Sequence, residues 1–176
     1  MRTEPVGKSP LQVISVGPGL FYASCSNLIF AIENTEPSVA YIVALRTLIQ
    51  QKSRELGRGL GLMVVIRSDT KPPSEEVREH IKNAAKAFGD HVLAFAHVVE
   101  GEGFLAAAKR AAFTLLMGTA RVGFPIKVFR NVSEGMPWLV RTVGDAFDED
   151  VSLTELVRLV EDFRRNPRVN ASPPVA

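Results

Sequence analysis

The chain has 176 residues, of which 46% are hydrophobic and 23% charged, and its formal net charge is +2. This length suffices for one hydrophobic core of ordinary size and is short for two, so we expect a single domain. The small basic excess is ordinary for a soluble protein and does not indicate nucleic-acid binding.

Several classes of protein are excluded by what the sequence lacks. Cys25 is the one cysteine, which rules out an internal disulfide and a cysteine-based zinc cluster and fits a reducing cytoplasm. The amino terminus has no secretory signal, and the longest apolar runs, near 60–66 and 111–117, are too short to span a bilayer. His80 and His91 have no partner at metal-ligand spacing, so we expect a cytoplasmic protein with no metal, no other cofactor and no membrane span.

The first third of the chain predicts an antiparallel edge followed by a helix. Residues 1–9 are expected to be a flexible lead-in. Three short strand candidates follow at Leu11–Val16, Leu20–Cys25 and Leu28–Asn34, and strands so close in sequence favour a meander. Thr35 is a plausible cap for a helix that runs to Gly57 and covers one face of the sheet.

The stretch from Leu62 to Val77 predicts the centre of the fold, a buried strand followed by a loop and a helix. Leu62–Ile66 is an unbroken apolar run typical of a central strand buried on both faces. A polar loop follows, and then a helix that begins near Ser74 with acidic residues in its first turn. In open α/β sheets this edge is where ligands and partners usually bind.

The second half repeats the order of strand and helix. Asp90–Glu100 predicts another buried strand, and the alanine-rich helix after Gly103 is so apolar that we expect it to be buried on more than one side. Phe124–Asn131 predicts the last strand, and a helix starts at Ser133. We expect the folded domain to cover 10–165.

An additional helix is predicted at the end of the domain. Ser152 and Glu155 have the spacing of a capping box, and five apolar residues form a stripe on the helix that they begin. That stripe must pack on the protein's own sheet or on a second copy, which would give a homodimer; the short acidic turn before the helix favours the first. The proline-rich tail 166–176 is predicted to be disordered.

This order of elements predicts an α/β fold with a mixed, mostly parallel sheet, an antiparallel edge meander and flanking helices. It resembles the STAS superfamily of anti-sigma-factor antagonists, in particular the small bacterial STAS/SEC14-like proteins. The resemblance covers about residues 10–144 and rests on LMVVI before an acidic helix start, VLAFAHVVEG before FLAAAKRAAFTLL, and KVFRNVSEGMPWLV.

The resemblance implies a binding site at the start of the second helix. The tentative partner-binding residues are Ser68, Asp69, Thr70, Ser74 and Glu75. The family's antagonists carry a phosphorylatable serine in an Asp-Ser pair, which this chain lacks. We predict that Ser74 is not phosphorylated, because the acidic residues after it would repel a phosphate.

Two functions from different classes follow. The first is a non-catalytic interaction module in bacterial signalling or cell organisation that binds another protein, such as a kinase-like or cytoskeletal partner, through this loop and helix start. The alternative is an enzyme or a binding protein for a small molecule or lipid, with a pocket at the strand ends formed by Asp69, His97, Glu100 and Glu102. A lone histidine in an apolar strand such as His97 is, however, more often a hydrogen-bonded core residue.

Overall fold

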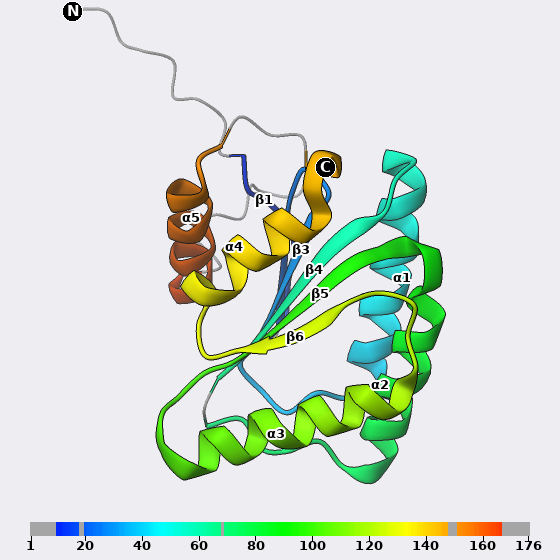
Figure 1. Cartoon of the computed structure of the whole chain (residues 1–176), viewed down its shortest axis with the longest axis vertical. Helices are drawn as coiled ribbons and strands as arrows, with labels where there is room; N and C mark the ends of the chain where they lie inside the picture. The colour runs from blue at the N-terminus through cyan, green and yellow to red at the C-terminus, as the bar shows by residue number, and fades with distance from the viewer. Residues whose placement is uncertain (1–9, 18–19, 68, 148–150, 167–176) are drawn as a thin grey trace, which may run out of the picture.

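In the part of the chain that the structure describes, six strands form one mixed sheet in the order β1-β2-β3-β4-β5-β6 (Figure 1). The computed structural model describes residues 10–17, 20–67, 69–147 and 151–166. The strands are β1 (Gln12–Gly17), β2 (Leu20–Cys25), β3 (Leu28–Glu33), β4 (Leu60–Ile66), β5 (Val92–Val99) and β6 (Ile126–Phe129). β1, β2 and β3 pair antiparallel, and β3 to β6 pair parallel. The predicted fold class, a single α/β domain with an antiparallel edge, is confirmed.

Five α-helices within the described residues cover the two faces of the sheet. They are α1 (Val39–Leu56), α2 (Glu75–Phe88), α3 (Gly103–Ala120), α4 (Val132–Val143) and α5 (Leu153–Arg165). Two short 3-10 turns, Gly89–His91 and Gly144–Ala146, follow α2 and α4. α1, α2 and α3 lie over one face, and α4 and α5 lie over the other (Figure 1). None of the helices within the described residues is both long and apolar enough to cross a membrane.

The alternation of side chains along the parallel strands divides the core into two halves. In β3, Phe30 and Ile32 face α4 and α5, whereas Ile29 and Ala31 face α1 and α2. All four are buried, because a strand covered by helices on both faces has no solvent side. This explains why the central strands have nearly continuous apolar sequences.

Several predicted boundaries need correction. α1 begins later than predicted: Ser38, not Thr35, is its cap, and the Ser38 hydroxyl accepts a hydrogen bond from the Tyr41 amide at 3.2 Å. Its predicted end is confirmed, since Gly57 has the left-handed conformation with φ of 63°. β5 starts at Val92 because the residues before it form a 3-10 turn.

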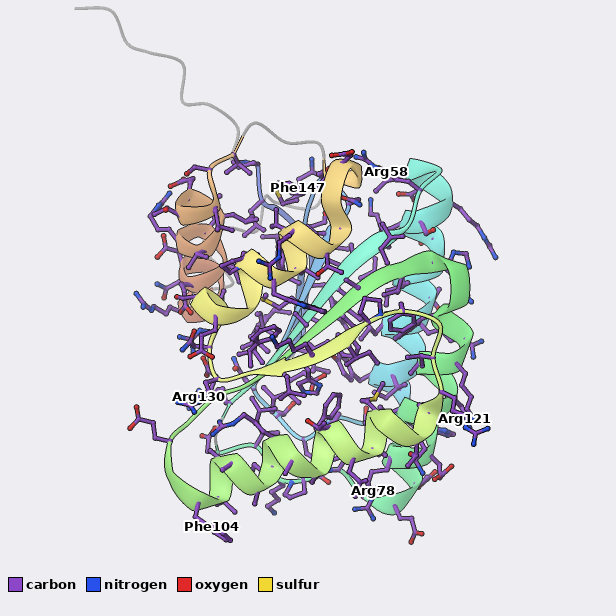
Figure 2. The ribbon with its side chains drawn as sticks, in the orientation of Figure 1. Arg58, Arg78, Phe104, Arg121, Arg130 and Phe147 are labelled. Atoms are coloured by element: carbon purple, nitrogen blue, oxygen red, sulfur yellow. The ribbon has the colours of Figure 1, made fainter. Side chains whose placement is uncertain are left out.

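The prediction that α3 is buried on more than one side is wrong. Only Ala106, Met117 and Ala120 of its 18 residues are buried. Phe104 is 89% exposed and points away from the body of the protein, and Leu115 is 71% exposed (Figure 2). Much of the apolar surface of α3 is therefore not covered by other parts of the described chain.

The additional helix α5 packs on its own sheet. Leu156, Val160 and Phe163 are fully buried in the core between the sheet and α4, and the Phe163 ring meets Phe21 of β2 edge to face at 6.5 Å. The Ser152 hydroxyl accepts from the Glu155 amide at 3.2 Å, which is the serine half of the predicted capping box. Most of the apolar stripe is therefore covered within one chain, and Leu153 at its start is 41% exposed.

Candidate functional site

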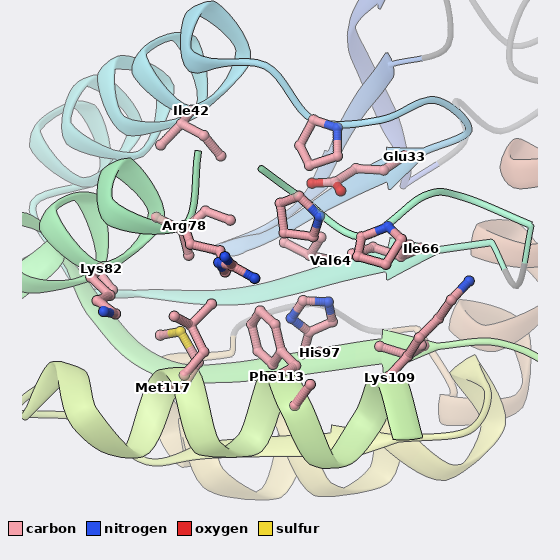
Figure 3. Close-up of a pocket in the computed structure, with 18 of the residues that line it drawn as sticks. Glu33, Ile42, Val64, Ile66, Arg78, Lys82, His97, Lys109, Phe113 and Met117 are labelled. Carbon is pink, nitrogen blue, oxygen red and sulfur yellow. The ribbon is translucent and has the colours of Figure 1, made fainter. Parts of the chain in front are cut away.

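A cavity of about 660 Å³ lies between the sheet and the three helices α1, α2 and α3. This volume is in the range of pockets that hold one small organic molecule. The side chains around it are mainly aliphatic and aromatic, with a few polar residues from β3, β5, the loop after β4, and helices α2 and α3 (Figure 3). It lies on the face of the sheet opposite α4 and α5.

The floor of the cavity follows from the strand register. Glu33 of β3 pairs with Ile66 of β4, and Val64 of β4 pairs with His97 of β5. Paired residues on parallel strands share a face, so these four side chains and Val99 all point toward the helices. The parallel strands thus present two polar side chains, Glu33 and His97, in an otherwise apolar floor.

His97 is the most unusual residue of this floor. It is 2% exposed, and neither ring nitrogen has a hydrogen-bond partner within the described part of the chain. Its ring stacks on Phe95 at 5.6 Å between centroids and touches the ring of Phe113 from α3. Burial lowers the pKa of His97 to about 3, so the imidazole is neutral at physiological pH, with one donor and one acceptor nitrogen. The expectation of a hydrogen-bonded core histidine is wrong.

Thr70 and Lys109 form the polar edge of the cavity near the ends of β4 and β5. Thr70 is buried, and its hydroxyl has no hydrogen-bond partner among the described residues. The Lys109 ammonium of α3 donates to the Thr70 carbonyl at 2.9 Å, which ties α3 to the loop after β4. Both side chains line the cavity.

Glu33 is a third buried polar group on the cavity wall, at the last position of β3. It is 4% exposed, and no cation lies within ion-pair distance of it among the described residues. Burial raises its pKa to about 7, and the Tyr41 hydroxyl acts against that rise, although no hydrogen bond of ordinary length joins the two groups. Tyr22 stacks on Tyr41 at 5.9 Å, and burial followed by the charge of Glu33 raises the pKa of both phenols.

The helices supply the apolar wall and a basic rim. Leu105, Ala108, Ala112 and Leu115 of α3 line the cavity although they are exposed, which explains the apolar sequence of this helix. Arg78 and Lys82 of α2 also border the cavity (Figure 3), and Lys82 pairs with Glu79 at 2.6 Å.

The residues predicted to bind a partner have different positions. Thr70 lines the cavity. Asp69 is exposed and pairs with Arg67 at 3.1 Å, and Glu75 lies exposed in the first turn of α2. The Ser74 hydroxyl caps α2 by accepting from the Val77 amide at 3.3 Å, while Ser68 is outside the described residues. The structure does not join them into one surface patch with a common role.

Of the four residues predicted to form a pocket, only His97 lines the cavity. Glu100 pairs instead with Arg164 of α5 at 2.6 Å, because it follows β5 at the position that leads to the other face of the sheet. Burial raises the Glu100 pKa, and Arg164 opposes that effect. Glu102 precedes α3 and is exposed, and Asp69 lies outside the cavity lining. Asp69, Glu100 and Glu102 therefore do not line this cavity.

Sequence reasoning missed Glu33 and Lys109. Glu33 ends the strand LIFAIE at an alternate position that faces the same side as Ile29 and Ala31, so the sequence contained a signal for a buried carboxyl. Lys109 had no such signal, since its contact with Thr70 joins residues 39 positions apart.

The arrangement is suited to binding. No group of three or more histidine, cysteine or acidic side chains in the described ranges is placed to hold a metal ion. Glu33 and His97 face one cavity, but they lie on strands separated by β4. The cavity offers an apolar volume with hydrogen-bonding groups at its edge.

No protein-family model, curated protein or solved structure matches this chain. The resemblance to the STAS superfamily therefore stays a prediction.

Proposed function

We propose that this protein binds a small, largely apolar molecule in the cavity between the sheet and α1, α2 and α3. The observation that carries the proposal is that polar groups are buried on the cavity wall without partners. His97 and Thr70 hold atoms that have no hydrogen-bond partner among the described residues, and Glu33 has no counter-ion there.

These groups oppose folding when the cavity holds no ligand. A buried polar group without a hydrogen bond lowers the free energy of unfolding by about 1–3 kcal/mol. Such groups are therefore few in stable proteins, and each usually has a structural or functional explanation. A ligand that hydrogen-bonds to them recovers part of that cost. The apolar wall adds a favourable contribution from burying the ligand body, at about 25 cal/mol per Å².

The position of the cavity supports the proposal that it binds a ligand. Thr70 follows β4, and Glu33 and His97 lie at or near the carboxyl ends of β3 and β5. In open α/β sheets this edge is the usual place of ligand sites, because the loops there vary without disturbing the sheet. Binding of a protein partner by the loop from Ser68 to Glu75 stays a separate prediction. No contact among the described residues supports it.

The proposal is tested by filling the cavity. Ala112 of α3 is exposed and lines the cavity, whereas the neighbouring Ala111 is exposed and does not. Ala112→Phe should occupy part of the ligand volume, and Ala111→Phe is the matched control with the same change in side chain. A thermal-shift panel of apolar alcohols, ketones and carboxylic acids is then applied to the wild type and to both variants.

A ligand at a hundredfold its Kd stabilises the wild type by about 2.7 kcal/mol, or roughly 5–10 °C in Tm. We expect Ala111→Phe to keep that shift and Ala112→Phe to lose most of it. A flat panel for the wild type, or equal shifts for the two variants, would contradict a ligand in this cavity.

A further inference from the structure

The polar groups of the cavity form two separate corners. His97 and Glu33 lie on β5 and β3, with β4 between them, and the register offsets them by two residues along the strands. Two strand spacings and two residue steps place their Cα atoms about 12 Å apart. Val64 and Ile66 of β4 fill the floor between the corners.

The first corner consists of His97, Thr70 and Lys109. It offers the Thr70 hydroxyl, one imidazole N–H and a lysine ammonium. His97 and Lys109 lie on the same side of the cavity in Figure 3, and the hydrogen bond to Lys109 places Thr70 beside them. The ammonium donates to the Thr70 carbonyl at 2.9 Å and places its positive charge in this corner. Three kinds of donor beside one positive charge suit a carboxylate.

The second corner is Glu33, which lies across the cavity from Lys109 (Figure 3). A carboxyl group accepts from a hydroxyl when ionised and can also donate to it when protonated, so a hydroxyl fits it in either state. An ammonium group fits less well, because Arg78, Lys82 and Lys109 line the same cavity and would repel it.

We infer that the ligand is a hydroxylated apolar carboxylic acid, with its carboxylate at Lys109, Thr70 and His97 and a distant hydroxyl at Glu33. This inference rests on the proposed function and adds the chemical class of the ligand. The apolar body lies over Val64 and Ile66, against the aliphatic wall of α3.

The test compares saturated fatty acids of eight, ten and twelve carbons with the same acids that carry a terminal hydroxyl. Affinities are measured by titration calorimetry on the wild type, Glu33→Met and Thr70→Val. At the best chain length, the wild type should bind the hydroxy acid roughly tenfold more tightly than the plain acid, as one added hydrogen bond to a charged or buried group predicts.

Glu33→Met should abolish that preference, so that the hydroxy acid and the plain acid bind with equal affinity. Thr70→Val, which keeps the side-chain shape, should weaken both acids by a similar factor and preserve the preference. Equal affinities for both acids at every length, or a preference that survives Glu33→Met, overturns the inference.

Failure of the inference is distinguishable from failure of the proposed function. If apolar alcohols or ketones shift the Tm of Ala111→Phe but not of Ala112→Phe, while neither series of acids binds the wild type, the cavity binds ligands and the class inferred here is wrong.

Discussion

Glu33 and His97 make opposite contributions to the pH dependence of stability. The Glu33 pKa is raised to about 7 in the folded chain, and the His97 pKa is lowered to about 3. A raised carboxyl pKa means that the folded state holds the proton longer, so its stabilising contribution is lost as pH rises from about 4.5 to 7. The lowered histidine pKa makes stability fall as pH decreases below about 6.5. The two effects partly cancel in the wild type.

The contribution of Glu33 can be isolated by substitution. Glu33→Gln keeps the shape of the protonated acid and removes its titration, while His97 titrates in both proteins. The free energy of unfolding of wild type minus variant should fall by about 3 kcal/mol between pH 4 and pH 8, since each pKa unit is worth about 1.4 kcal/mol. Urea denaturation across this range measures it, and a difference that stays constant with pH would show that Glu33 titrates normally.

The helices α5 and α3 differ in how their apolar side chains are covered. α5 buries its apolar stripe against the sheet and α4, and Arg164 secures its end by pairing with Glu100 and Glu161, each at 2.6 Å. α3 instead turns Leu105 and Leu115 to the cavity and leaves them exposed. The first helix contributes to stability, and the second leaves apolar side chains exposed beside the cavity in which we propose that a ligand binds.

The structural role of α5 predicts a large effect at Phe163. Phe163→Ala should lower the free energy of unfolding by about 3–5 kcal/mol, the usual cost of emptying a buried phenylalanine site. Leu153→Ala, in the same helix but at a 41% exposed position, should cost far less. Chemical denaturation gives both values. Light scattering should show the same mass for both variants as for wild type, and a change of mass would instead support the alternative of a homodimer.

At the scale of the molecule, the two faces of the sheet differ in how well they are filled. The core under α4 and α5 includes Phe30, Met63 and Leu139, all without exposed surface. The opposite half surrounds a cavity of about 660 Å³, and its helix α3 buries three of 18 residues, against five of 12 in α4. Local stability should therefore differ between the faces.

Hydrogen exchange measures this difference. In the ligand-free protein, backbone amides in the middle of α3 should exchange markedly faster than those of α4, because α3 opens without disturbing the main core. A ligand that fills the cavity should slow exchange in α3 and leave α4 nearly unchanged. Equal protection of the two helices without ligand would contradict this prediction, because α3 would then be as firmly packed as α4.

The sequence by itself determined the α/β class, the antiparallel edge and the central strand, because hydrophobic periodicity and turn residues act locally. It predicted the Gly57 helix end and the Ser152 cap, which depend on residues a few positions apart. It did not determine the site. Glu33, Thr70, His97 and Lys109 come from separate segments, and only strand order and register decide which side chains share a face. The same limit explains α3: composition shows that a helix is apolar, but only the tertiary structure decides whether that surface meets a core or a cavity.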